Sequence, residues 1–462
     1  MKQRGETLRR ASGYLLALPF VLMAPSLARS ADSPQPVQQP PAQPAAAKDP
    51  NVLTLDEAVL TALANHPNLK AARERIGAQE AVLGQQMAAY FPTLTLNNFY
   101  ETGQTRDAAA AARPSDARAS EIFSSEGRLS YTIYNFGKRE GAVEAARETL
   151  NATGHNYKTT VDSVILGAKT SYYILLGTQA IVKVREETVK NRELLVKQAR
   201  GFYEVGTRAK IDVARAESNL YNAQADLIAA QNGVKVAWVT LKNALGLREL
   251  AERPLVEEAI MTTIPFTLEQ AREIAYANRP ELKSFEAQRK AQDQNIATAR
   301  RGHLPDIIFD ANYGRRHESG DEGPNGKHHN TFPLQPAWSV GVSLNIPIFD
   351  GFRTTNRVEE TLRNYHVIRA QEEAQRQQVA LDVESAYLRL VELQERIKAN
   401  EAAASAAKEN LDLANGRYQV GVGSIIEVTD AQTLYTDAQT TYIRALYDYK
   451  IADAQLVRAV GQ

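Results

Sequence analysis

The feature that most constrains this chain is an internal repeat, because two copies of one sequence unit are expected to fold in the same way. The segment Leu53–Ala58 (LTLDEA) returns as Phe266–Ala271 (FTLEQA), 213 residues later. Further along, Tyr203–Gly206 (YEVG) returns as Tyr418–Gly421 (YQVG), 215 residues later. Because the spacing drifts by only about two residues, the sequence predicts two structural repeats in one chain.

The N-terminal segment has the pattern of a secretory signal peptide. Basic residues precede a short apolar run at Gly13–Met23, and small residues at Ala28 and Ser30 form a cleavage site. The predicted parts are therefore a signal peptide at 1–30, a Pro-rich leader at 31–50, the first repeat at 51–248, a linker at 249–265 and the second repeat at 266–462.

Each repeat has the same predicted order of elements: a helix, a strand pair, a very long helix, a turn and a long return helix. Residues 138–202 and 355–417 contain no proline, and their apolar residues recur at steps of three and four. About 65 helical residues span roughly 100 Å. Return helices are expected over 210–245 and 424–460.

Four segments alternate apolar and polar residues, which predicts half-buried strands. They pair as 93–100 with 127–134 in the first repeat and as 307–313 with 338–346 in the second. Strands of this length cross a bilayer when tilted. Trp338 and Tyr313, at strand ends, fit an interfacial aromatic belt.

Four strands cannot close a barrel, and an open sheet edge is not tolerated in lipid. Two chains would supply about 8 strands, whose interior is filled by side chains, whereas three would supply about 12 and leave an aqueous lumen. A cyclic homotrimer is therefore the simplest assembly that closes a barrel around an aqueous lumen. Its polar strand faces would line water, and its apolar faces would meet outer membrane lipid.

Several motifs resemble those of one known family. They are the LTLDEA and FTLEQA openings, the segment Asn345–Gly351 (NIPIFDG), and the two tip segments Phe202–Glu217 and Arg417–Gln432. Over nearly all of residues 51–462 the chain resembles the outer membrane efflux protein family, the TolC-like channels. The resemblance implies an α+β membrane protein: a trimeric 12-stranded outer-membrane β-barrel, with four strands per chain, continued by a long periplasmic α-helical coiled-coil barrel.

The resemblance also implies a function and partners. The chain would be the outer membrane channel of a tripartite export system for drugs or toxic compounds, working with a periplasmic adaptor protein and a proton-driven or ATP-driven inner-membrane pump. Metal efflux and type I protein secretion stay open, because nothing in the helices distinguishes these cargoes. A periplasmic coiled-coil scaffold is the alternative of a different class, and the four amphipathic strands disfavour it.

Composition and motifs argue against other classes. Lys plus Arg and Asp plus Glu are both 54, so no nucleic-acid partner is expected. The sequence lacks serine-hydrolase, zinc-protease and Walker patterns, so we expect no enzyme and no cofactor. There are no cysteines, and the histidines at 317, 328 and 329 fit an exposed loop better than a metal site.

Two carboxylates at the start of the last helix are the candidate gate. Glu427 and Asp430 stand three residues apart and so share a helix face. By resemblance they align with the acidic ring at the periplasmic mouth of these channels, where three chains would bring six carboxylates together and favour cations. The alternative is that they are acidic residues favoured at a helix N-terminus by the helix dipole.

Three further residues are candidates for a latch that closes the mouth. Asp212 and Tyr418 resemble the latch residues of the family. The family also has an arginine two residues after the second turn glycine, but this chain has Gly423 there, and Arg208 holds the equivalent place in the first repeat. We therefore expect the latch residues of this chain to make different contacts from those of the family.

The two turns between long helices are the expected contact for the adaptor, again by resemblance. Glycines there also serve plain reversal of the backbone, which is a sufficient explanation by itself. The residues concerned are Val205, Gly206 and Thr207 in the first repeat, and Val420, Gly421, Val422 and Gly423 in the second.

Overall fold

The structure is a computed structural model that describes residues 52–105, 118–256, 265–320 and 334–462. The predicted signal peptide at 1–30 and leader at 31–50 lie outside the described residues, as do His328 and His329.

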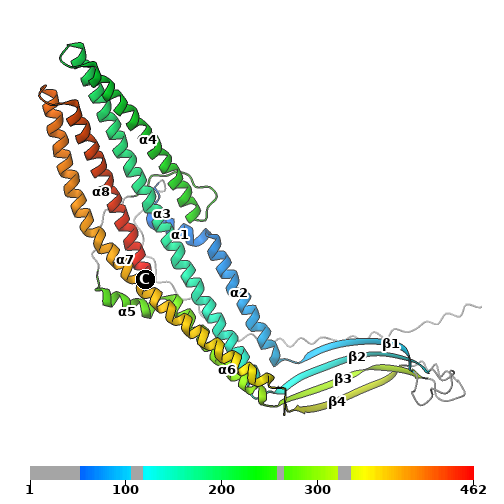
Figure 1. Cartoon of the computed structure of the whole chain (residues 1–462). Coiled ribbons are helices and arrows are strands. Elements are labelled where there is room, and N and C mark those ends of the chain that lie inside the picture. Colours follow the sequence, from blue (N-terminus) through cyan, green and yellow to red (C-terminus); the bar gives the residue numbers. More distant parts are fainter. Residues whose placement is uncertain (1–51, 106–117, 257–264, 321–333) are drawn as a thin grey trace, which may run out of the picture. The chain divides into compact units, whose positions relative to one another are not determined.

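The same order of elements occurs twice along the chain (Figure 1). The first series consists of α1 (Leu55–Asn65), α2 (Pro67–Met87), β1 (Thr93–Thr105), β2 (Arg118–Tyr134), α3 (Lys138–Glu204) and α4 (Lys210–Ala244). The second consists of α5 (Leu268–Asn278), α6 (Pro280–Arg300), β3 (Asp306–Gly320), β4 (Gln335–Asn345), α7 (Arg353–Gln419) and α8 (Ile425–Val460). Short 3-10 helices, η1 (Ala88–Tyr90) and η3 (Arg301–His303), precede β1 and β3.

Local sequence signals explain where the short helices begin and end. The Thr54 hydroxyl accepts a hydrogen bond from the backbone N–H of Glu57 at 3.2 Å and caps α1. At the start of α5, Thr267 and Gln270 form a complete capping box. Prolines open the helices that follow, α2 and α6, since proline is accepted in the first helical turn.

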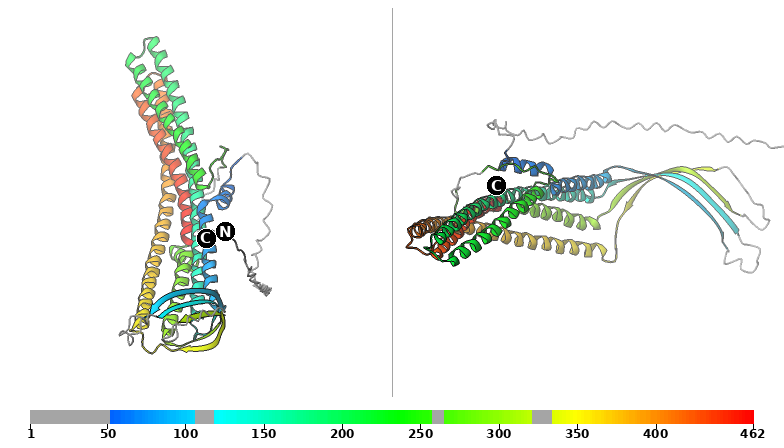
Figure 2. Two further views of the ribbon diagram at one scale, coloured as in Figure 1. Left: turned by 90° about the vertical axis from the view of Figure 1, so that its right-hand side faces the viewer. Right: turned by 90° about the horizontal axis from the view of Figure 1, so that it is seen from above.

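The four strands form one antiparallel sheet in the order β1-β2-β3-β4, seen as a curved sheet in Figure 2. Its register places apolar residues opposite one another across all four strands. One such row is Leu94, Leu129, Ala311 and Val340, and the neighbouring polar row is Thr95, Arg128, Asn312 and Ser339. The expected alternation therefore produces one apolar face and one polar face.

The predicted strand ranges are too short. The structure has 13 residues in β1, 17 in β2, 15 in β3 and 11 in β4. The ladder between β1 and β2 continues to the pair of Thr105 with Arg118, because backbone hydrogen bonds extend pairing through polar residues that show no alternation. At the other end of the sheet, β4 stops at Asn345 rather than at Ile346.

The two outer strands each have a single partner. Within the described residues, β1 pairs with β2 alone and β4 pairs with β3 alone. Their outer edges therefore carry backbone N–H and C=O groups that this chain does not pair.

The long helices pack as two antiparallel hairpins, α3 with α4 and α7 with α8, and α3 also contacts α8. The buried hydroxyl of Tyr172 on α3 lies 3.0 Å from the carbonyl oxygen of Leu53 and 2.9 Å from that of Val256. It thereby ties the start of the first repeat to the segment that follows α4. In the described ranges, no helix combines the length and the apolar character needed to cross a membrane.

Candidate functional site

The site is built at the two turns that join the long helices, residues 205–209 between α3 and α4 and residues 420–424 between α7 and α8. The strand β2 leads into the start of α3, so the first turn lies at the opposite end of that helix from the sheet (Figure 1). Gly206 and Gly421 adopt φ values of +75° and +85°. A residue with a side chain is strained in this left-handed conformation, which accounts for glycine at both turns.

A shared apolar core holds the two turns together. It joins α3 and α4 of the first hairpin to α7 and α8 of the second through Leu195, Val196, Ala199, Ala216, Leu411, Ala414, Tyr418, Ile425, Val428 and Ala431. Tyr418 is 1% exposed, and its ring packs edge-on against Phe202 with centroids 5.5 Å apart. The tips of the two hairpins therefore form one packed unit.

Arg208 crosses from the first hairpin to the second. Its Nη2 donates to the carbonyl oxygens of Gly421 at 3.0 Å and Gly423 at 2.6 Å. Its guanidinium carbon also lies 5.6 Å from the centroid of the Tyr418 ring, a cation–π distance.

Asp212 acts on the same tyrosine. Burial raises the pKa of Tyr418, and the charge of Asp212 raises it further. The structure thus places Arg208 against Tyr418 within one chain, whereas Asp212 acts on that tyrosine through its charge alone.

The two predicted gate carboxylates are exposed at the start of α8. Ser424 caps this helix by accepting a hydrogen bond from the N–H of Ile426 at 3.2 Å. The Oε2 of Glu427 lies 3.3 Å from the Nε of Arg417 in an exposed ion pair. Asp430 follows one helical turn later, on the same face of α8.

A buried arginine lies behind this acidic pair. Arg192 on α3 is 6% exposed, and its Nη2 donates to the hydroxyl of Thr433 at 2.9 Å and to the carbonyl oxygen of Thr429 at 3.4 Å. Burial lowers the pKa of Arg192, and the charge of Asp430 opposes that shift.

The sequence reasoning missed Arg192, although a signal for it was present. Arg192 precedes the buried Leu195 and Val196 by three and four residues, so it lies on the buried face of α3. Arg417, which pairs with Glu427, was also missed as a partner of the carboxylates.

Comparison with known proteins identifies the family of this chain. The sequence model of the outer membrane efflux protein family matches the chain twice, over residues 59–247 and 271–462. The chain belongs to this family. The predicted fold class and the location of an outer membrane protein are therefore confirmed, and the family is one of transport proteins.

Individual relatives of this efflux-family chain are distant but cover most of it. The outer membrane protein TolC of Vibrio cholerae is 26% identical over 409 residues, which are 86% of this chain and 88% of that protein. The toluene efflux pump outer membrane protein TtgC of Pseudomonas putida is 24% identical over 411 residues, 88% of this chain and 82% of that protein. The crystal structure of the outer membrane channel CmeC of Campylobacter jejuni matches with a TM-score of 0.75 at 19% identity, covering 88% of this chain and 85% of that one.

The structure explains how this efflux-family chain departs from the expected pattern at Gly423. A Cβ atom there would lie 2.9 Å from the backbone carbon of Arg417 and 2.9 Å from the backbone nitrogen of Tyr418. The second turn therefore has no room for a side chain at this position. The guanidinium of Arg208 reaches the carbonyl oxygen of Gly423 from the other hairpin.

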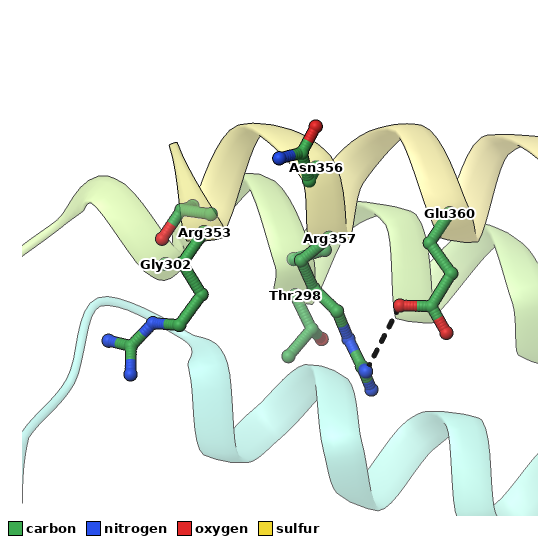
Figure 3. Close-up of a pocket in the computed structure, with 8 residues that line it drawn as sticks. Thr298, Gly302, Arg353, Asn356, Arg357 and Glu360 are labelled. Carbon is green, nitrogen blue, oxygen red and sulfur yellow. Dashed lines mark hydrogen bonds and ion pairs between the residues drawn. The ribbon is translucent and has the colours of Figure 1, made fainter. Parts of the chain in front are cut away.

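A separate hollow of about 490 Å³ lies where α6 and η3 meet α7 (Figure 3). Thr298, Gly302, Arg353 and Arg357 are among its lining residues, and Arg357 is paired with Glu360 at 3.2 Å. It brings together none of the predicted site residues. Among the described residues no group of three potential metal ligands occurs, and His317 lies in β3 rather than in a loop.

The tight packing at Gly423 leads to a test. Gly423→Ala should loosen the second turn, because the added Cβ meets backbone atoms that cannot move independently, and we expect a loss of about 1–3 kcal/mol in local stability. Amide hydrogen exchange over residues 418–426 measures this.

Gly416→Ala is the matched control. Its Cβ would meet nothing within 4 Å on α7, so it should leave exchange in the turn unchanged or slower. Equal exchange in the two variants would contradict the packing described.

Proposed function

We propose that this chain is the outer membrane channel component of a tripartite export system. It would pass drugs or other toxic compounds, delivered by an inner-membrane pump through a periplasmic adaptor, across the outer membrane. The observation that carries the proposal is a four-stranded sheet with one apolar face and two outer edges that no other described strand pairs, from which helices of 67 residues extend. A periplasmic scaffold would have no use for such a sheet.

The functional unit is a homotrimer. Four strands from each of three chains would pair the free edge of β1 with that of β4 in the next chain and close a barrel of about 12 strands, wide enough for an aqueous lumen. The polar row of the sheet would then face water and the apolar row outer membrane lipid.

Drug or toxic-compound export is the cargo we favour. The relative from Pseudomonas putida is named for toluene efflux, and the family is named for efflux in general. Metal efflux and type I protein secretion would use the same architecture, and no feature of the described residues favours either of them.

The acidic pair is the proposed periplasmic gate. Glu427 and Asp430 are exposed on one face at the start of α8, with Arg417 paired to the first of them. Three copies around one axis would concentrate negative charge at the mouth and attract cations.

Conductance tests both the channel and its gate. Reconstituted in planar lipid bilayers, the wild-type protein should conduct ions. The double variant Glu427→Ala with Asp430→Ala should have a lower preference for cations. In a salt gradient, this shifts the reversal potential toward the equilibrium potential of chloride. A silent bilayer would refute the channel, whereas unchanged selectivity would refute only the acidic ring.

The latch is proposed to lie between the two hairpins of each chain. Arg208 is hydrogen-bonded to the second turn and lies over the ring of the buried Tyr418, so beside the shared apolar core one polar side chain joins the two tips. Movement of one hairpin against the other would break these contacts first.

Removal of one latch group should ease opening. Asp212→Ala should raise the conductance of the closed channel, because it removes a charge of the first hairpin that acts on Tyr418 of the second. Single-channel recording measures this, with Asp226→Ala on the same helix as the control, since Asp226 pairs with Arg185 away from the turn. Unaltered closed-state conductance in Asp212→Ala would count against the latch.

The turns are the proposed adaptor contact. Val205, Val420 and Val422 are 72%, 74% and 69% exposed, so each turn presents apolar side chains to solvent. Exposed apolar groups gathered at one end of a molecule are typical of a protein interaction site.

Crosslinking locates this contact. A photoreactive side chain at Thr207 or Val422 should capture the adaptor in whole cells, and one at Ile228, further along α4 and equally exposed, should not. Failure of both turn positions to capture an adaptor would refute docking at the turns.

A further inference from the structure

Arg192 is a buried charge whose hydrogen bonds do not go to a carboxylate. Its Nη2 contacts a hydroxyl and a backbone carbonyl of α8, and its Nη1 has no hydrogen-bond partner among the described residues. Burying a cation costs several kcal/mol unless a nearby negative charge compensates it. Such a residue therefore needs an anion close enough to act through the protein interior.

The position of Arg192 identifies that anion. The two α8 residues that it contacts, Thr429 and Thr433, flank Asp430 in the sequence. Asp430 thus directly follows a residue whose backbone carbonyl Arg192 contacts, and its negative charge favours the charged form of the guanidinium, opposing the lowering of the Arg192 pKa by burial. One gate carboxylate thus has a fixed cation behind it.

We propose that Arg192 is the counter-charge of the acidic mouth and thereby sets how strongly the channel prefers cations. This inference rests on the proposed gate formed by Glu427 and Asp430. Each chain would bring two carboxylates, the exposed Arg417 and the buried Arg192 to this level, so Arg192 would offset one negative charge per chain.

Burial distinguishes Arg192 from the other arginine at this site. Arg417 pairs with Glu427, but both side chains are about half exposed, so water and salt screen the pair. The guanidinium of Arg192 is enclosed by protein and held by two hydrogen bonds. Water therefore screens the charge of Arg192 less than that of Arg417, even though the carboxylate of Asp430 is itself exposed.

The test removes the charge while keeping a hydrogen-bond donor. Arg192→Gln should raise the potassium-to-chloride permeability ratio, measured from reversal potentials in a salt gradient, by about threefold or more, because Asp430 then acts without its counter-charge. Block by a trivalent cation such as lanthanum, added from the side of the turns, should strengthen in the same variant. Arg192→Lys keeps the charge and should match the wild type.

Two further variants make the result specific. Arg192→Gln combined with Asp430→Asn removes one charge of each sign per chain, and its permeability ratio should return close to the wild-type value. Arg185→Gln removes a charge seven residues earlier on α3, where Arg185 pairs with Asp226, and should leave selectivity unchanged. Because channels are recorded only after assembly, every value comes from folded protein.

The outcomes separate this inference from the proposed gate. If removal of both gate carboxylates lowers cation preference but Arg192→Gln leaves it unchanged, the gate stands and the role of Arg192 is refuted. If Arg192→Gln has the same effect with and without Asp430, the assignment of Asp430 as its partner is refuted. If neither the carboxylates nor Arg192 affect selectivity, both proposals fall.

Discussion

The edges of the sheet are the constraint on which the rest of the molecule depends. Inside a bilayer, backbone N–H and C=O groups have no water to bind, so every strand edge must be paired. In the part of the chain that the structure describes, the inner edges of the four strands are paired, and one edge of β1 and one of β4 are left open. Association of identical chains is therefore a condition for inserting the sheet at all. Within the chain, the internal repeat also serves the pairing of strand edges, since each copy of the repeat supplies one pair of strands.

Much of the helical structure follows from sequence periodicity, whereas the extent of the sheet does not. The absence of proline and the three- and four-residue spacing place the long helices within about two residues of α3 and α7. Strand ends were misplaced because residues 101–105 and 118–126 are largely polar and show no consistent alternation, yet their backbones continue the ladder. A hydrogen-bonded ladder depends on the partner strand, which a local pattern does not contain.

The sequence likewise predicts one part of the candidate site and not the other. Glycines at equivalent places in the two repeats predict both turns, and local spacing places Glu427 and Asp430 on one face. The arginines that complete the site act across the repeats: Arg192 reaches a residue 237 positions away, and Arg208 reaches carbonyl groups 213 and 215 positions away. Backbone carbonyl groups carry no sequence signal, so these partners become visible only once the hairpins are packed.

The equal length of α3 and α7, 67 residues each, has a consequence for how such a chain can evolve. A single residue inserted into either helix advances everything beyond it by about 1.5 Å and rotates it by about 100°. The guanidinium of Arg208 would then lie out of hydrogen-bonding reach of the opposite turn. Apolar side chains of the lengthened helix would no longer face the shared core. The two helical hairpins can therefore change in length only when both gain or lose the same number of residues, in whole helical repeats.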